Sequence, residues 1–189
     1  MILGIFGFTG SGKTTVTKYI TEKYNFKAID LDVISREIMD LEESQNFVKM
    51  TFPQAYNMQT QKVDRKILRE IIFNSPIENQ KLSQYMWPKI KEHVIQTITS
   101  SKENIIIDGA ILPKLNIPID KYIYVSADQQ DLLHRIKVRD NANENTTYEL
   151  LKYQGELLYE SVKDFEIHNN SSIEKLYQQI EIIMKKIKD

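Results

Sequence analysis

The opening of the chain, GIFGFTGSGKTTVTKYI, constrains the fold more than any other stretch. An apolar run at residues 2–6 leads into a glycine-rich segment, and helical spacing follows over Thr14–Lys23. Four glycines lie within nine positions, namely Gly4, Gly7, Gly10 and Gly12. Because glycine permits the backbone conformations that a sharp turn needs, this order predicts a strand, a tight loop and a helix.

Residues 7–14 match GxxxxGK[ST], the phosphate-loop pattern, in its required place between a first strand and a helix. The glycines let backbone N–H groups face inward around phosphate oxygens, and the helix N-terminus adds positive partial charge. We expect Lys13 to reach the β- and γ-phosphates of ATP and the Thr14 hydroxyl to bind Mg²⁺. The predicted nucleotide-binding residues here are Gly7, Thr9, Gly10, Ser11, Gly12, Lys13, Thr14 and Thr15. The alternative is a glycine-rich turn without a ligand.

Four more apolar runs alternate with helical patterns along the chain. We expect strands at residues 26–30, 105–107, 121–127 and 165–169, and a last helix at Ser172–Lys186. This alternation predicts an α/β fold of the P-loop NTP hydrolase type, a doubly wound parallel sheet of five strands. Residues 35–102 have helical periodicity and no convincing strand, which indicates a helical insertion. With a charged helical lid region at 128–159, they complete a single domain over 1–189.

Composition excludes several classes of protein. The chain has 25 Lys plus Arg against 26 Asp plus Glu, so its overall charge favours neither nucleic acid nor an acidic membrane as partner. It has no cysteine, which excludes disulfides, thiolate nucleophiles and cysteine-bound zinc. No apolar run reaches the roughly 20 residues of a membrane helix, and the start lacks signal-peptide features. We expect a cytoplasmic protein with a small-molecule substrate, without nucleic-acid or membrane partners, as a monomer or weak oligomer.

A phosphate loop indicates a nucleotide but not a reaction. The third strand ends in DGAI rather than the DxxG of a GTPase, and the chain contains neither NKxD nor an LSGGQ-type signature. It is also short for a ring ATPase. A compact core with a helical insertion and a late arginine-bearing helix is typical of a kinase that acts on a small acceptor.

The second predicted strand leads into AIDLDVISRE, the most informative polar cluster. Asp30 and Asp32 stand where a parallel strand delivers residues to the cleft at its carboxyl end. A carboxylate there can accept the proton of an acceptor hydroxyl and orient it toward the γ-phosphate. Alternatively, Asp32 caps a helix that begins at Val33. Arg36, four residues on, could steady Asp32 or hold a substrate phosphate, or form an ordinary surface ion pair.

Four further residues are candidates at the nucleotide or the substrate. Arg135 and Arg139 are an i, i+4 pair, so both could close over the triphosphate, although charged helices are usually solvated faces. Asp108 ends the third strand, where it could belong to the magnesium shell and substrate site or could cap the strand end. Arg65, next to Asp64, could meet a substrate phosphate, but helix-start charge is the plainer account. The three histidines lack metal-ligand spacing.

Taken in order, these segments resemble the dephospho-coenzyme A kinase family over the whole chain. The family patterns TGGIGSGKS, IDADxIAR, LDRxxLRxxxF and DxPLL are matched by FGFTGSGKT, IDLDVISR, VDRKILREIIF and DGAIL. RIKVRD matches RxxxRD, Gln154 matches a family glutamine, and IHNNSSIEKL matches IxNxGxxxxL. The departures are Phe8 and Thr9 for a GI pair, Trp87 for a histidine, and Gly109, Ala110 and Pro113 around the PLL segment.

The resemblance implies transfer of the ATP γ-phosphate to the ribose 3′-hydroxyl of dephospho-coenzyme A. It implies that Asp32 is the base, that Arg139 is the nucleotide-lid arginine, and that the helical insertion forms much of the acceptor pocket. Two alternatives stay open: a nucleoside monophosphate or other small-metabolite kinase, and a nucleotide-binding regulatory module without catalysis. The intact Lys13, Thr14 and Asp32 argue against the second.

Overall fold

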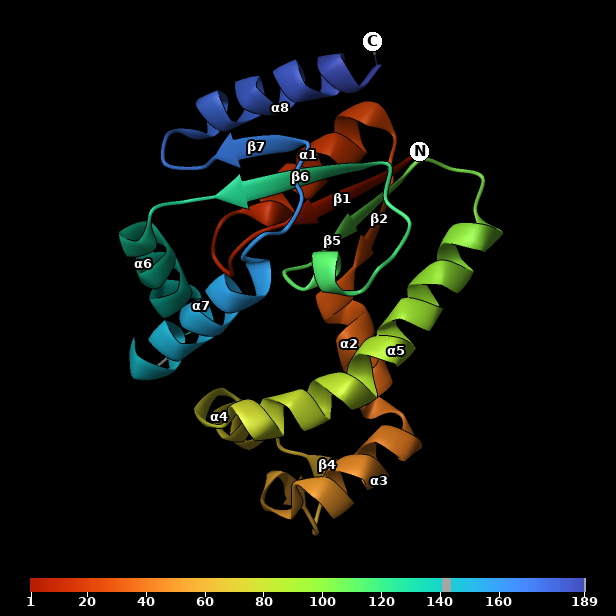
Figure 1. Ribbon diagram of the computed structural model, residues 1–189, viewed down its shortest axis with the longest axis vertical. Helices are drawn as coiled ribbons and strands as arrows, with labels where there is room; N and C mark the ends of the chain where they lie inside the picture. The colour runs from red at the N-terminus through yellow and green to blue at the C-terminus, as the bar shows by residue number, and fades with distance from the viewer. Residues whose placement is uncertain (141–143, 189) are drawn as a thin grey trace. The chain divides into compact units, whose positions relative to one another are not determined.

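A computed structural model describes residues 1–140 and 144–188, with the side chains of Asp140 and Glu144 excepted. The chain forms two compact units (Figure 1). The core unit comprises Met1–Leu31 with Val94–Asp189, and the insertion unit comprises Asp32–His93.

The core unit is built on a five-stranded parallel sheet, which confirms the predicted fold class. Its strand order is β2-β5-β1-β6-β7. The strands are β1 (Ile2–Phe6), β2 (Lys27–Asp30), β5 (Ile105–Asp108), β6 (Lys121–Ser126) and β7 (Phe165–His168). Since β1 lies in the middle of the sheet, the loop that follows it opens at the centre of the carboxyl edge.

Helices of the core unit follow the strands: α1 (Lys13–Tyr24), α6 (Gln129–Asp140), α7 (Glu144–Leu158) and α8 (Ile173–Lys188), with a short 3₁₀ turn η2 (Leu112–Lys114). The predicted lid region is thus two helices, and its residues 141–143 lie outside the described residues. Apolar residues of α1 and α8 pack with alternate residues of the strands, such as Leu3 and Ile5 of β1. Ile180 of α8 is fully buried there, which contributes roughly 1.5–3 kcal/mol relative to exposure.

The insertion unit is mostly helical. It contains most of α2 (Leu31–Asp40), α3 (Glu42–Thr51), the 3₁₀ turn η1 (Pro53–Ala55), α4 (Arg65–Asn74) and the first part of α5 (Pro76–Ser100). Apolar contacts within it include Phe47, whose ring stacks on Tyr85 at a centroid distance of 3.8 Å.

The expectation of no strand in this region is wrong. Two-residue strands β3 (Tyr56–Asn57) and β4 (Lys62–Val63) form an antiparallel hairpin. The Asn57 side chain closes its turn by accepting hydrogen bonds from the backbone N–H groups of Gln59 and Thr60. Strands of two residues are too short to produce a period-2 pattern, so local side-chain chemistry determines the hairpin instead.

Candidate nucleotide-binding site

The loop between β1 and α1 has the backbone that the phosphate-loop pattern requires. Gly7, Gly10 and Gly12 have φ values of 149°, 82° and 97°, in the region that favours glycine. A Cβ atom on Gly7 would lie 2.1 Å from the backbone O of Val125, and one on Gly12 would lie 2.2 Å from Asn169 Nδ2. Packing and backbone conformation therefore both demand glycine at Gly7, where the close atom belongs to the backbone, whereas at Gly12 the positive φ is the main reason because the Asn169 side chain can move.

Lys13, Thr14 and Thr15 form the first turn of α1, directly after Gly12 at the N-cap position. The Lys13 ammonium is half-buried and donates to the Phe8 carbonyl over 3.1 Å, so it lies back against the loop. Thr14 is exposed, while the Thr15 N–H donates to the Gly12 carbonyl over 3.0 Å. The N-cap residue, Gly12, has no side chain to cap this helix start, so the positive end of α1 can face an anion.

Ser11 gives a second indication of a missing ligand. Its hydroxyl is buried, and among the described residues Oγ has no hydrogen-bond partner. Buried polar atoms without a partner are uncommon, and a bound ion or water is a usual partner for them. The glycine cradle, the uncapped helix and this hydroxyl together fit a phosphate group.

Three consecutive loop residues are each held by a side chain from another element. Thr9 donates its N–H to Gln154 Oε1 over 2.9 Å and accepts at Oγ1 from Gln154 Nε2 over 2.8 Å. The Gly10 carbonyl accepts from Arg135 Nη1 over 3.3 Å. The Ser11 carbonyl accepts from Asn169 Nδ2 over 2.8 Å. The loop conformation is therefore fixed from α7, α6 and the segment after β7.

The Arg135 side chain has three defined contacts that the sequence does not predict. Besides Gly10, its guanidinium donates to the Asn169 carbonyl over 2.8 Å and lies 3.5 Å from the Asp131 carboxylate. It thus joins α6 to the loop. Arg139, one turn further along α6, is exposed. The predicted closure of both arginines over a triphosphate stays a prediction.

The sequence analysis predicts no role for Gln154 or Asn169 in this loop. Gln154 matches a family glutamine, and Asn169 lies in the segment that matches IxNxG, but neither match names the residue's contact. That pattern was the available signal, since 145 residues separate Gln154 from Thr9 along the chain. No local periodicity links positions so far apart.

Asp30 and Asp108 end two adjacent strands, and their Cα atoms are paired in register. Asp108 is only 6% exposed, and one of its oxygens accepts from Thr17 Oγ1 of α1 over 3.2 Å. Asp30 is exposed. The structure thus gives both carboxylates the predicted place at the carboxyl edge of the sheet, near the start of α1.

The alternative account of Asp32 needs a correction. Helix α2 begins at Leu31 rather than Val33, so Asp32 lies in the first turn and not at the N-cap position.

Leu31 is 2% exposed, and a Cβ atom on Gly109 would lie 2.5 Å from its Cδ1. Gly109, directly after β5, therefore leaves room for the side chain of Leu31, the first residue of α2.

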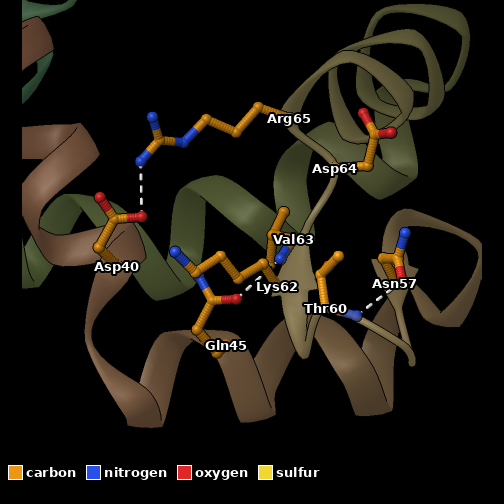
Figure 2. A pocket seen from close by; sticks show the side chains of 8 residues that line it. All are labelled: Asp40, Gln45, Asn57, Thr60, Lys62, Val63, Asp64 and Arg65. Carbon is orange, nitrogen blue, oxygen red and sulfur yellow. Dashed lines mark hydrogen bonds and ion pairs between the residues drawn. The ribbon is translucent and has the colours of Figure 1, made fainter.

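The insertion unit has a pocket of about 540 Å³ (Figure 2). Its lining residues come from the end of α2, from α3, from the hairpin and from the start of α4, and are Asp40, Gln45, Asn57, Thr60, Lys62, Val63, Asp64 and Arg65. Arg65 Nη2 donates to Asp40 over 2.7 Å and to the Arg36 carbonyl over 3.3 Å. Asp64 is the N-cap of α4 and accepts from the N–H groups of Lys66 and Ile67, whereas the substrate role of Arg65 stays a prediction.

Within residues 1–140 and 144–188, no group of three or more His, Cys, Asp or Glu residues could hold a metal ion. Over the same residues, no helix is long and apolar enough to cross a membrane.

Known sequences are similar to this chain over most of its length. The family model described as dephospho-CoA kinase matches residues 1–175. The dephospho-CoA kinase of Fusobacterium nucleatum is 32% identical over 186 residues, covering 96% of this chain and 95% of the relative. That of Borreliella burgdorferi is 30% identical over 198 residues, covering 99% and 94%.

Solved structures agree at the level of the fold. The dephospho-CoA kinase of Campylobacter jejuni superposes with a TM-score of 0.63 at 23% identity, covering 98% of this chain and 96% of that one. A deoxyadenosine kinase of M. mycoides, solved with bound dATP, gives a TM-score of 0.59 at 19% identity and covers both chains fully. At such identities the similarity shows a P-loop kinase fold and nothing finer.

Proposed function

The chain belongs to the dephospho-CoA kinase family, and on that basis we propose that it transfers the γ-phosphoryl group of ATP to the ribose 3′-hydroxyl of dephospho-CoA. The products are CoA and ADP. The observation that carries the proposal is an intact phosphate loop, with its glycine conformations, Lys13 and Thr14, in a chain that matches the family over residues 1–175.

ATP would be held by the loop amides and by the start of α1. Lys13 would exchange its bond to the Phe8 carbonyl for contacts with the β- and γ-phosphates. Thr14 and Asp108 are the residues that would hold Mg²⁺, and this ion would supply neutralisation of the phosphate charge. Arg135 and Arg139 would add positive charge from α6, with Arg135 already at the Gly10 carbonyl.

Asp32 is the proposed base. It follows directly on Leu31, whose side chain is fixed against Gly109 in the core unit. A carboxylate at this position would accept the proton of the 3′-hydroxyl as the oxygen attacks the γ-phosphate. Asp30, one residue before Leu31, and Arg36, one turn further along α2, are the proposed substrate contacts on either side.

The acceptor would be held in part by the insertion unit. Its pocket of about 540 Å³ is large enough for part of a nucleotide-sized molecule and presents Lys62 and Arg65. A substrate phosphate that reached Arg65 would compete with Asp40 for the guanidinium, whereas Lys62 is exposed. We assign the first phosphate contact to Lys62 for this reason.

An acceptor panel tests the function. ADP formation is measured with Mg²⁺, ATP and either dephospho-CoA, a set of nucleoside monophosphates or no acceptor. We expect dephospho-CoA to give the largest kcat/KM. Preference for a monophosphate would identify the smaller-acceptor alternative, and the absence of turnover with every acceptor would favour the regulatory module.

The same panel with Asp32→Asn tests the base. We expect kcat to fall at least roughly 100-fold while ATP affinity stays within about threefold, because a general base acts on the transition state. Glu37→Gln is the matched control, an exposed carboxylate on the same helix. Unchanged kcat in Asp32→Asn would remove this residue from the mechanism.

We also propose that the protein works in the cytoplasm as a monomer or weak oligomer. The support is the absence of a membrane-spanning helix among the described residues and the near balance of 25 basic and 26 acidic side chains. Sedimentation equilibrium would test the oligomeric state, and a stable dimer at micromolar concentration would contradict it.

A further inference from the structure

We propose that Gln154 is a positioning residue that holds the phosphate loop in its nucleotide-binding conformation through Thr9. The proposal rests on nucleotide binding by this loop, which is one part of the function proposed above. Gln154 lies on α7 and is 7% exposed, and its side-chain amide makes two hydrogen bonds to one loop residue. Such a pair fixes both the position and the orientation of the partner.

The orientation of the Gln154 amide follows from the chemistry of Thr9. The Thr9 backbone N–H can only donate, so the atom 2.9 Å from it is Oε1. Nε2 then faces the Thr9 hydroxyl, which accepts over 2.8 Å. Both ends of the buried amide are thereby satisfied by the same residue. Replacement of Gln154 by an apolar side chain would leave the Thr9 N–H without this partner at a part-buried site.

The surroundings show why one residue can control the loop. Phe8, directly before Thr9, packs against an apolar cluster of α6 and α7 formed by Leu132, Ile136 and Leu151. Gly155, directly after Gln154, faces the Phe8 ring, and a Cβ atom there would lie 3.9 Å from it. Two neighbouring residues of α7 therefore lie against two neighbouring residues of the loop.

Of the three side chains that hold residues 9–11, Gln154 makes the most hydrogen bonds to the loop. Arg135 reaches Gly10 over 3.3 Å and divides its guanidinium among three acceptors, and Asn169 makes one bond to Ser11. Gln154 makes two bonds of 2.9 and 2.8 Å to Thr9. A loop that loses this pair would populate other conformations, and the nucleotide would bind only the competent fraction.

A substitution at Thr9 can separate the two bonds of Gln154, because one is made by the Thr9 backbone N–H and the other by its hydroxyl. An isoleucine would retain the backbone N–H bond and lose only the hydroxyl bond. Thr9→Ile is therefore a variant that removes one of the two contacts and leaves the other.

The experiment compares Gln154→Met, Thr9→Ile and their double mutant, with Gln178→Met as control at an exposed glutamine of α8. ADP affinity is measured by calorimetry without acceptor, so a failure of the proposed acceptor chemistry cannot affect the result. We expect roughly tenfold weaker ADP binding in Gln154→Met and about twofold in Thr9→Ile. The double mutant should match Gln154→Met, because the second contact is already lost.

Two further readouts separate positioning from general destabilisation. Hydrogen exchange at the backbone amide of residue 9 should accelerate in Gln154→Met and stay slow in Thr9→Ile and in the control. KM for ATP should rise with KM for the acceptor unchanged. The proposal is overturned if Gln154→Met lowers Tm while ADP affinity stays within twofold of wild type, or if Thr9 exchange is unchanged.

Discussion

Asp30 and Asp108 are paired in register at the ends of β2 and β5, so two carboxylates stand side by side at the carboxyl edge of the sheet. Their environments differ, because Asp30 is exposed whereas Asp108 is 6% exposed and accepts from Thr17 of α1. The buried member is thereby tied to the helix that follows the phosphate loop. This relationship makes the role of Asp108 testable.

We expect Asp108→Asn to lower kcat roughly 100-fold or more with the fold retained, because the shape is kept while the charge available to a metal ion is lost. Thr17→Val is the complementary change, since it removes the hydrogen bond and keeps the charge. It should cost about 1 kcal/mol of unfolding free energy and little activity. Steady-state kinetics against Mg²⁺ concentration and urea unfolding measure the two effects. If Asp108 only caps the strand end, Asp108→Asn will retain its turnover.

The glycine at position 7 gives a prediction about ATP affinity. Gly7→Ala places a Cβ atom 2.1 Å from the Val125 carbonyl oxygen, so the backbone must shift. We expect nucleotide binding to weaken at least roughly tenfold, since the cradle depends on this turn.

Gly155→Ala is the matched control, because its Cβ atom meets Phe8 at 3.9 Å and the residue is helical. That variant should be as stable as wild type or up to about 1 kcal/mol more stable. Calorimetric titration with ADP and thermal melts would show both results.

Gly109 and Leu31 should behave as a coupled pair. Gly109→Ala forces an added Cβ atom to 2.5 Å from Leu31 Cδ1, and overpacking of this kind costs about 1–3 kcal/mol. Leu31→Ala alone leaves a cavity and costs about 2–5 kcal/mol. The double variant restores the family's alanine at position 31 and should be more stable than the sum of the single effects predicts. Urea unfolding of all four proteins gives the coupling free energy, and strict additivity would contradict the pairing.

Lys62 is the expected phosphate contact of the insertion pocket. Lys62→Ala should raise KM for dephospho-CoA about three- to tenfold and leave KM for ATP unchanged, because only the acceptor is proposed to reach this pocket. Lys66→Ala is the control, an exposed lysine of α4 that does not line the pocket. Equal effects of the two changes on acceptor KM would mean that general positive charge, and not this pocket, attracts the substrate.

The sheet could be predicted because β1 and β5 are apolar runs with clear ends and helical patterns separate the strands along the chain. The last strand, predicted at 165–169, is observed at Phe165–His168, and the last helix, predicted at Ser172–Lys186, at Ile173–Lys188. The loop residues could be named because their pattern is local. The contacts of Gln154 and Asn169 with that loop could not, since they join residues 145 or more positions apart. The β3–β4 hairpin was missed because two-residue strands depend on the turn chemistry of Asn57.

The last prediction concerns stability in acid. Asp164 accepts from the backbone N–H of Tyr122 over 2.8 Å and from Lys121 Nζ over 2.9 Å, and these bonds hold the pKa of its carboxyl below the ordinary value. A depressed pKa means that the stabilisation is present above the ordinary aspartate pKa of about 4 and is lost as pH falls through the lower pKa of the folded protein.

Asp164→Asn should therefore lower the unfolding free energy by roughly 0.5–1 kcal/mol at pH 7, a small figure because the site is partly exposed. The difference from wild type should shrink below pH 4. Urea unfolding from pH 3 to 7, with the exposed Glu156→Gln as control, measures it, and a difference that stays constant across this range would rule out the carboxylate as its cause.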